Sequence, residues 1–503
     1  MTARCLMVLG TTSGAGKSWL TTALCRWYAR QGLKVAPFKA QNMSNNARVV
    51  GTAQGAGEIG SAQYFQALAA AGVLPDVRMN PVLLKPEVQS KSQVVLLGQV
   101  SAELTQMPWG DRSEKLWPFI TEALDALRAE NDLVIIEGAG SPAEINLMSR
   151  DIVNLRVARY AQARCLLITD IDRGGAFAHL YGTWALLPKA DQALLCGFVL
   201  NKFRGEKSLL TPAPEHLLAL TGVPTVATVP YWREHGLPEE DGLFDDRLQT
   251  ARPATVTVAV IAYPSLSNLD EFQALKNIAG VRLVWVRELT QLPTLKPTDW
   301  LVLPGSKHTS SDLSWLQAQG FAHALHAHAK QGGPILGICG GLQMLGERLL
   351  DPHGVDGNAE GLGLLAVVTE FAEAKTVRRC QVQFGAVTGA WSTLARLEFQ
   401  GYEIHQGQTH LINAKQEAHK SVQRAPDTPD NRAHTREVIN GLAWQNGSGN
   451  VLGLYVHGLF EAPSVLCALF GSQARTLDTV FDGLADCLER NSTPGFLQAL
   501  IAD

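Results

Sequence analysis

The sequence has no CxxC pair, no excess of basic residues and no apolar run near the about 20 residues that cross a bilayer. Its 8 cysteines are scattered singly, which argues against a zinc ribbon and against a disulfide scaffold. A formal net charge of -4 argues against broad attraction to nucleic acid or anionic lipid. The first apolar stretch, residues 5–9, is too short for a signal sequence and runs into a glycine-rich turn. We therefore expect a cytoplasmic protein without a nucleic-acid or membrane partner.

Short apolar runs alternate with helical patterns along most of the chain, which is typical of parallel β-sheets covered by helices. At 503 residues the chain is long enough for roughly two or three domains. We predict an α/β fold with two parallel-sheet domains. A helix is predicted over about 17–31, and the predicted strands are 6–9, 33–37, 133–136, 165–168, 197–200 and 225–229 in the first half and 256–261, 281–286, 300–303, 335–338 and 452–456 in the second.

Interruptions of this pattern set the predicted domain boundaries. Residues 233–252 are rich in Pro, Glu and Asp and lack a sustained period, which is typical of a linker. The predicted domains are therefore residues 1–232 and 253–464. Apolar residues at helical spacing predict a C-terminal helical tail over 465–503. A polar stretch at about 413–437 is interpreted as an exposed insertion.

A glycine-rich turn, Gly10-Thr-Thr-Ser-Gly-Ala-Gly-Lys-Ser18, follows the first predicted strand and opens the first helix. In this context backbone N–H groups and the helix N-terminus bind phosphate, the lysine reaches the β and γ oxygens, and the serine ligates magnesium. The loop is one residue longer than the standard GxxxxGK[ST], because Thr11 stands where the first glycine is usual. The predicted ATP-binding residues are Thr11, Thr12, Ser13, Gly14, Gly16, Lys17 and Ser18.

This loop resembles that of dethiobiotin synthetase and its relatives, and the run Val134-Ile-Ile-Glu137-Gly-Ala-Gly140 is a second matching motif. The resemblance implies that Glu137 ligates Mg²⁺ with Ser18 and that Asn201, at another strand end, recognises adenine. Three more charged residues, Asp170, Asp172 and Arg173, also follow a strand. We interpret them as candidate substrate contacts, with an ordinary loop as the alternative.

The run Pro334-Ile-Leu-Gly337-Ile-Cys339-Gly340-Gly341-Leu-Gln343 predicts a strand, a tight turn and a helix with Cys339 at the apex. Small flanking residues permit such a strained turn, and a helix N-terminus favours the thiolate, so the pattern indicates a nucleophile. A thiol nucleophile needs a base, and Leu454-Tyr-Val-His457-Gly places a histidine after a late strand. The other cysteines are assigned structural roles, and His323, His326 and His328 are expected to be solvated.

The pairing of Cys339 with His457 resembles class I glutamine amidotransferases. The resemblance implies that Cys339 attacks the glutamine amide, that Gln343 helps to bind glutamine, and that Gly305 and Gly340 supply the oxyanion N–H groups. Class I enzymes carry a glutamate two residues after the histidine, but that position is Leu459, and Glu461 is out of register. We therefore expect a Cys–His dyad, with low glutaminase activity until synthesis begins.

Beyond these motifs the chain resembles the cobyric acid synthase family of cobalamin biosynthesis. The resemblance rests on Pro37-Phe-Lys39-Ala-Gln41-Asn42-Met-Ser-Asn-Asn46, Ile168-Thr-Asp-Ile-Asp-Arg-Gly-Gly175, Asn201-Lys-Phe-Arg-Gly205, Leu303-Pro-Gly-Ser-Lys-His-Thr309 and Gly401-Tyr-Glu-Ile-His405. It implies successive amidation of side chains b, d, e and g of a corrinoid, adenosylcobyrinic acid a,c-diamide, with Mg²⁺ as cofactor and ATP and glutamine as co-substrates. Lys39, Gln41 and Asn42 become candidate substrate contacts.

Two alternatives remain at this point. One is the related enzyme that amidates the a and c side chains, and the block 37–46 favours cobyric acid synthase over it. The other is a nucleotide switch of the MinD/ParA type with a relic amidotransferase domain, which intact Cys339, Gln343 and His457 argue against. The oligomeric state is left open, with a homo-oligomer among the alternatives.

Overall fold

The computed structural model describes residues 2–52, 55–86, 92–238, 254–412, 435–471 and 475–502. The chain forms two compact units, Met1–Asp241 together with Thr476–Asp503, and Gly242–Arg475. The stretch predicted as one tail over 465–503 is therefore divided. Helix α14 (Pro463–Phe470) belongs to the second unit, whereas α15 (Leu477–Asn491) and α16 (Phe496–Ala499) complete the first. Most of the predicted linker and of the predicted polar insertion lies outside the described residues.

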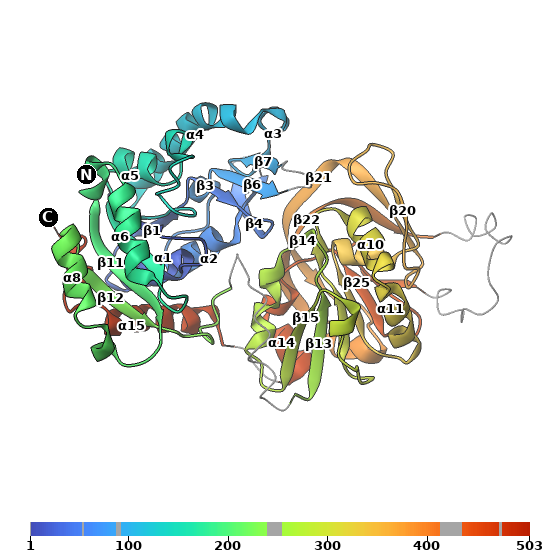
Figure 1. The fold of residues 1–503 in the computed structure, drawn as a ribbon. Helices are drawn as coiled ribbons and strands as arrows, with labels where there is room; N and C mark the ends of the chain where they lie inside the picture. The colour runs from blue at the N-terminus through green and yellow to red at the C-terminus, as the bar shows by residue number, and fades with distance from the viewer. Residues whose placement is uncertain are drawn as a thin grey trace. The chain divides into compact units, whose positions relative to one another are not determined.

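The first unit is built on a six-stranded sheet whose paired strands all run parallel (Figure 1). In sheet order its strands are β12 (Thr225–Pro230), β11 (Leu195–Phe203), β10 (Arg164–Asp170), β1 (Arg4–Gly10), β9 (Leu133–Glu137) and β2 (Val35–Phe38). Five of these strands contain a strand predicted for the first half, lengthened by one to three residues at one or both ends, and β2 is shifted from the predicted 33–37. Strands β9 and β2 lie on one side of β1, and β10, β11 and β12 lie on the other, so the strand order reverses at β1. In parallel sheets, ligands bind at such a reversal, at the carboxyl ends of the strands.

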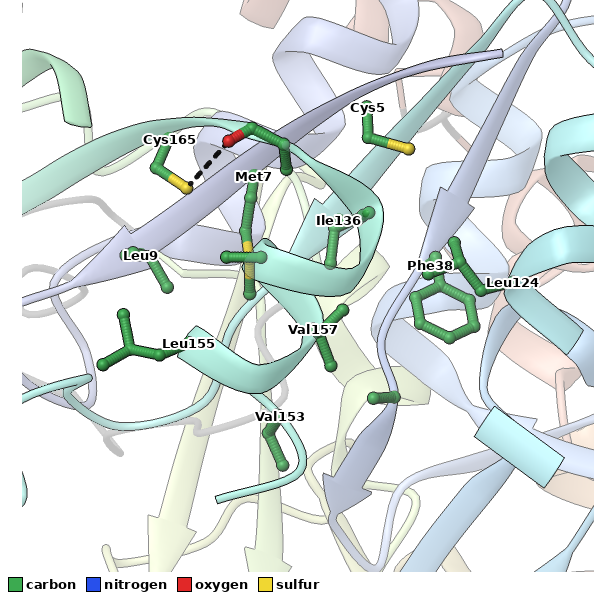
Figure 2. Packing of buried hydrophobic residues seen from close by; sticks show 14 of the residues in the cluster. Cys5, Met7, Leu9, Phe38, Leu124, Ile136, Val153, Leu155, Val157 and Cys165 are labelled. Carbon is green, nitrogen blue, oxygen red and sulfur yellow. Dashed lines mark hydrogen bonds between the residues drawn. The ribbon is translucent and has the colours of Figure 1, made fainter. Parts of the chain in front are cut away.

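Helices cover both faces of this sheet, which explains why its strands are apolar throughout rather than alternating. On β1, Cys5, Met7 and Leu9 face the layer of α4 (Trp109–Glu130), α5 (Leu155–Ala161) and α6 (Ala176–Leu186). Figure 2 shows Met7 and Leu9 packed close to Ile136, Leu155 and Val157. The alternate residues, Leu6 and Val8, face α1 (Lys17–Arg30), α15 and α16.

Several elements of the first unit were not predicted from the sequence. Strands β3, β6, β7 and β8 form a second sheet, and β4 and β5 form an antiparallel hairpin. These and the remaining elements are β3 (Gln41–Met43), β4 (Ala47–Thr52), β5 (Gly55–Gly60), α2 (Ser61–Ala69), η1 (Val77–Met79), β6 (Val82–Pro86), β7 (Ser92–Leu96), β8 (Gln99–Val100), α3 (Ala102–Gln106), η2 (Met148–Arg150), α7 (Lys189–Gln192), η3 (Lys207–Leu210) and α8 (Ala213–Thr221).

The second unit contains a seven-stranded sheet, parallel except at one edge, where β24 pairs antiparallel with both β25 and β23. In order its strands are β15 (Val281–Val286), β13 (Val256–Ile261), β16 (Trp300–Leu303), β18 (Ile335–Ile338), β25 (Val451–Leu454), β24 (Ala443–Gln445) and β23 (Arg436–Ile439). One face packs against α10 (Thr309–Ala318), α11 (Phe321–Lys330) and α12 (Gly340–Leu345). The other packs against α9 (Gln273–Lys276), α14 and the ends of two long strands.

Those two long strands, β21 (Val367–Gln383) and β22 (Glu398–Leu411), form an antiparallel ribbon that the sequence did not predict. Together with β19 (Arg348–Leu350) and β20 (Ala359–Glu360) they make a separate four-stranded sheet. The other elements are β14 (Leu266–Ser267), η5 (Leu269–Phe272), η6 (Leu289–Gln291), β17 (Gly305–Ser306), η7 (Gly389–Leu394) and η8 (Leu459–Glu461).

The predicted fold class is confirmed, since both units are α/β with mainly parallel sheets. One expectation about the surface is wrong: His328 is 5% exposed, and its Nε2 lies 2.8 Å from the carbonyl oxygen of Asp299. Among the described residues, every helix is too short or too polar to cross a bilayer.

Candidate active sites

The first candidate site is the phosphate loop between β1 and α1, where Lys17 is held by the loop itself. Its Nζ donates to the carbonyl oxygens of Thr12 and Gly140, at 3.1 Å each, so the ammonium lies between the loop and the turn after β9. Gly16 has φ 105°, in the left-handed region that favours glycine. A Cβ there would lie 2.0 Å from Asn201 Nδ2. This loop therefore requires glycine at position 16 for backbone shape and for space.

Asn201 supports the loop rather than facing away from it. Its Nδ2 donates to the carbonyl oxygen of Ala15 at 2.9 Å, and the side chain is buried. Thr11, which replaces the usual first glycine, donates to Thr169 Oγ1 at 3.0 Å. The structure thus brings the ends of β10 and β11 against the loop, and adenine recognition by Asn201 stays a prediction.

A buried cluster of polar groups surrounds Glu137 at the end of β9. One carboxylate oxygen, Oε1, accepts from Ser18 Oγ and from Lys39 Nζ, at 2.9 Å each, and Oε2 accepts from Gln66 Nε2 at 2.5 Å. Burial raises the pKa of this carboxyl, but Lys39, Gln66 and Lys17 outweigh burial and hold the pKa below its ordinary value. Glu137 is therefore an anion at neutral pH, although its exposure is 0%.

This cluster fits a magnesium ion that is shared with a nucleotide. Sites that bind magnesium together with a nucleotide use one or two protein oxygens, and phosphate and water complete the coordination shell. Ser18 and Glu137 offer such a hydroxyl and carboxylate pair, side by side at the end of the phosphate loop. No group of three or more His, Cys, Asp and Glu side chains that could hold a metal ion occurs among the described residues.

The charged residues after β10 form a network beside the phosphate loop. Asp170 Oδ2 lies 3.0 Å from Lys202 Nζ and 3.4 Å from Arg173 Nε, and Lys202 Nζ also donates to the carbonyl oxygen of Gly14 at 2.9 Å. Asp172 pairs with Arg204 at 2.8 Å. Asp170 is buried, whereas the Arg173 side chain is 55% exposed. Among these predicted substrate contacts, Asp170 thus has a supporting position and Arg173 is open to solvent.

The three candidate substrate contacts after β2, Lys39, Gln41 and Asn42, lie in different surroundings. Lys39 joins the Glu137 cluster described above. Asn42 is buried on β3 and donates to Gln63 Oε1 at 3.3 Å. Gln41 begins β3 and is half buried. Only Lys39 is therefore placed in direct contact with the candidate magnesium ligands.

The second candidate site is the turn between β18 and α12, which carries Cys339. This residue has φ 52° and ψ -106°, a strained conformation for a residue with a side chain. A Cβ on Gly341 would lie 1.9 Å from the carbonyl oxygen of Leu303, and one on Gly337 would lie 2.7 Å from Gly341. These contacts explain why small residues flank the cysteine, and the strained turn holds its thiol at the apex.

His457 interacts electrostatically with Cys339. It also contacts a carboxylate that the sequence did not reveal. Glu271 Oε1 is 3.2 Å from His457 Nδ1, and Glu271 Oε2 accepts from the backbone N–H of Gly458 at 3.3 Å. Asn268 Nδ2 is 3.3 Å from the same ring nitrogen. Both charged side chains are almost fully buried, at 1% and 0% exposure. The expectation of a dyad without a carboxylate is therefore wrong.

The same contacts determine the charge of His457. Burial lowers its pKa, but the interactions with Glu271 and Cys339 outweigh burial and raise the pKa from 6.5 to about 10. At neutral pH the ring is an imidazolium, which can give a proton to a leaving group. With an acid in contact, the reason for expecting low glutaminase activity before synthesis no longer applies.

Glu271 supplies the carboxylate that position 459 lacks, although it lies far from His457 in the sequence. It lies in η5, shortly after β13, whose carboxyl end shares a sheet edge with those of β18 and β25. The sequence signal that could have pointed to Glu271 is an acid that follows a strand at that edge, in the run Ser267-Asn-Leu-Asp-Glu271. Position 459 itself is a fully buried leucine.

The predicted oxyanion and glutamine-binding residues surround the same turn. A Cβ on Gly305 would lie 3.2 Å from His457 Cε1, and one on Gly340 would lie 2.8 Å from the backbone nitrogen of Ser306. Gln343 is buried, with Oε1 accepting from Thr309 Oγ1 at 2.9 Å and Nε2 directed at Tyr455 Oη at 3.4 Å. Tyr402 stacks on the His457 ring with centroids 5.3 Å apart. The structure therefore brings all the predicted residues of this half together.

Family models match both units. Residues 6–241 match the CobQ/CobB/MinD/ParA nucleotide binding domain, and residues 257–465 match the CobB/CobQ-like glutamine amidotransferase domain. The combination defines a glutamine-hydrolysing amidoligase that carries its own ATP-binding domain.

Curated relatives identify the family. A protein of Variovorax paradoxus named cobyric acid synthase is 67% identical over 502 residues, covering 100% of both chains. Proteins of the same name from Polaromonas naphthalenivorans and Methylibium petroleiphilum are 65% and 60% identical, and each alignment covers 100% of this chain and 100% and 97% of the relative. The chain belongs to the cobyric acid synthase family. A solved glutamine amidotransferase aligns with 46% of the chain and 98% of its own, at 17% identity and a TM-score of 0.29, and carries no argument.

Proposed function

We propose that the chain amidates side chains b, d, e and g of adenosylcobyrinic acid a,c-diamide, with ATP and glutamine, to give adenosylcobyric acid. The full-length identity of 67% to a protein named cobyric acid synthase carries this proposal. The geometry supports it, because a phosphate loop and a Cys339–His457–Glu271 arrangement occur in one chain. A cytoplasmic location, the absence of nucleic-acid partners and the oligomeric state stay predictions from the sequence.

The first unit would activate the carboxylate. A carboxylate does not react with ammonia until its oxygen becomes a leaving group, and transfer of the γ-phosphoryl group from ATP gives an acyl phosphate and ADP. Lys17 would bind the phosphate oxygens once it leaves the carbonyl oxygens of Thr12 and Gly140. We propose that Ser18 and Glu137 hold Mg²⁺, which neutralises phosphate charge when bound. Lys39 would then face the reacting phosphate from beside Glu137.

The second unit would release ammonia from glutamine. The Cys339 thiolate attacks the side-chain amide carbon, the backbone N–H groups of Gly305 and Gly340 stabilise the oxyanion, and His457 gives its proton to the departing nitrogen. Ammonia leaves and a thioester remains on Cys339. Water activated by the now neutral His457 hydrolyses the thioester to glutamate, and Glu271 keeps the ring oriented throughout. The liberated ammonia displaces phosphate from the acyl phosphate to form the amide.

Two other functions are weighed against this proposal. One is the nucleotide switch of the MinD/ParA type considered above. The contact of His457 with Glu271, beside an intact Cys339, argues against a relic glutaminase. Amidation of the a and c side chains is the nearer alternative. Incubation of the protein with ATP, glutamine and each corrinoid, followed by mass measurement of the products, separates these functions. A mass increase with cobyrinic acid but not with its a,c-diamide would contradict the proposal.

The decisive variant is Cys339→Ser, which keeps the size of the side chain and removes the reactive thiol. Glutamine-dependent amidation should fall by about a thousand-fold or more, since a covalent step is lost. Amidation from ammonium chloride should survive and increase with pH as the unprotonated fraction grows. Cys467→Ser is the matched control, because Cys467 is an exposed free cysteine of the same unit. Loss of both activities in a folded, ATP-binding Cys339→Ser protein would contradict the two-site proposal.

A further inference from the structure

Two short strands outside the main sheet connect different parts of the glutaminase site. Strands β14 and β17 pair antiparallel, with Leu266 opposite Ser306 and Ser267 opposite Gly305. Strand β17 contains Gly305, the proposed oxyanion donor beside His457. Strand β14 leads directly to Asn268 and then to Glu271, both of which contact His457 Nδ1. The relative position of the two strands therefore sets the oxyanion donor and the acid with respect to one histidine.

A single buried carboxylate joins the two strands. Asp312 lies on α10 and is 1% exposed. Its Oδ1 accepts from the backbone N–H of Ser265 at 3.0 Å, and its Oδ2 accepts from Ser306 Oγ at 2.5 Å. The backbone N–H of Lys307 also donates to the carbonyl oxygen of Ser265 at 2.8 Å. Asp312 thus bonds to the residue that precedes β14 and to the last residue of β17.

We propose that Asp312 is a positioning residue of the glutaminase reaction, which holds Gly305 and Glu271 in register around His457 through Ser306 and Ser265. The proposal rests on the glutaminase role assigned to Cys339 and His457 above. Asp312 acts through other residues: Gln343, which would contact glutamine, is held by Thr309 and not by Asp312. Its loss should therefore lower the rate of the chemical step more than the affinity for glutamine.

The charge of Asp312 adds a pH dependence to this geometry. Burial raises its pKa to about 6, the Ser306 and Ser265 hydrogen bonds oppose this effect, and Asp356 adds to it. Asp356 caps α10 by accepting from the backbone N–H groups of Thr309 and Ser310. Tyr263, whose hydroxyl donates to the carbonyl oxygen of Pro304, is another titratable group near this carboxylate. As pH falls through about 6, a proton on Asp312 removes one acceptor from the connection.

The test measures glutamate release by Asp312→Asn, Asp312→Ala, Ser306→Ala and the Asp312→Ala/Ser306→Ala double variant. We expect kcat to fall by about ten- to a hundred-fold in Asp312→Ala with KM nearly unchanged, because small displacements of catalytic groups cost rate. Ser306→Ala should lower kcat as well, and the double variant should lose less than the product of the single effects. Glutaminase activity of the wild type should fall below a pH of about 6, and this decrease should be absent in Asp312→Asn.

A matched control distinguishes positioning from general stability. Asp299 is also buried and also accepts from two N–H groups, those of Thr257 and Lys296, but it lies at the amino end of β16. Asp299→Asn should therefore leave the glutaminase rate near that of the wild type in the folded fraction. Amidation from ammonium chloride should be unchanged in every variant, since the first unit is intact.

The outcomes separate this inference from the proposed function. If Asp312→Asn and Asp312→Ala keep kcat within about two-fold of the wild type while Cys339→Ser is inactive, the inference is wrong and the proposed function stands. If Cys339→Ser still hydrolyses glutamine, the proposed function itself fails. Should Asp312→Ala not fold, Asp312→Asn, Ser306→Ala and the Asp312→Asn/Ser306→Ala double variant decide. Additive effects of the two single changes in that double variant would also overturn the inference.

Discussion

Replacing Glu271 by glutamine removes the charge that sets the state of His457 and keeps the shape of the side chain. The carboxylate and the ring are 3.2 Å apart, so their attraction is about 5 kcal/mol at an effective dielectric constant of about 20. Because one pKa unit corresponds to about 1.4 kcal/mol, Glu271→Gln should lower the pKa of His457 by roughly three to four units. The ring is buried, and burial lowers its pKa further, so the variant should hold a neutral imidazole at neutral pH.

Two measurements follow from this shift. Wild-type glutaminase activity should decline as pH rises through about 10, where the imidazolium loses its proton. In Glu271→Gln that decline should move to near neutral pH or below, and kcat at neutral pH should fall by about a hundred-fold or more, as expected for loss of an acid–base partner. Glutamate release assayed against pH measures both effects. Amidation from ammonium chloride should remain at the wild-type rate.

The control is Glu461→Gln, which alters the acid nearest to His457 in the sequence. Glu271 contacts the ring although 186 positions separate the two residues. Glu461→Gln should therefore change kcat by less than about two-fold. An unchanged rate and an unchanged alkaline decline in Glu271→Gln would refute the assignment of this carboxylate as the partner of His457.

Two further changes test the nucleotide half and the turn that carries the nucleophile. Lys17→Ala and Glu137→Ala should lose amidation with glutamine and with ammonium chloride alike, since both nitrogen sources need the acyl phosphate. ATP binding, measured by calorimetry with and without magnesium, should weaken in each variant. Near-normal turnover of Lys17→Ala at saturating ATP would contradict this prediction. Gly341→Ala places a Cβ 1.9 Å from the Leu303 carbonyl oxygen, so it should lower the free energy of unfolding by about 2 kcal/mol or more, measured by denaturant titration, and should abolish glutaminase activity. A Gly341→Ala protein with wild-type stability and activity would show that this close approach is not needed.

The strands that bear the two sites could be predicted because buried parallel strands leave continuous apolar runs. Strands β13, β15, β16 and β18 have the predicted bounds. The phosphate loop and the nucleophile turn could also be predicted from the sequence, since each needs glycines at fixed spacing next to one lysine or one cysteine. Local backbone chemistry determines such features, so a single stretch of sequence contains them.

What the sequence did not reveal depends on contacts between distant segments. Glu271 reaches His457 only because the ends of β13 and β25 meet at one sheet edge. Gln66 reaches Glu137 because α2 follows strands that were not predicted. His328 was expected at the surface, since a histidine in a polar helical pattern gives no indication of its carbonyl partner on another element. Side-chain partners of this kind follow from topology and register, which the apolar pattern does not specify.

The division of the first unit into two separate stretches of chain determines the order in which its core is completed during synthesis. Helix α15 packs along α1, the helix that begins at the phosphate loop, and its Val480, Phe481 and Leu484 belong to the same apolar cluster as Leu20 and Leu24. Arg26 pairs with Asp482 across this contact at 2.8 Å. These residues leave the ribosome only after the whole glutaminase unit has been made. A prematurely terminated chain therefore lacks the helix that covers one part of α1, and the helix that begins at the phosphate loop gains all its packing only in a chain that already contains the source of ammonia.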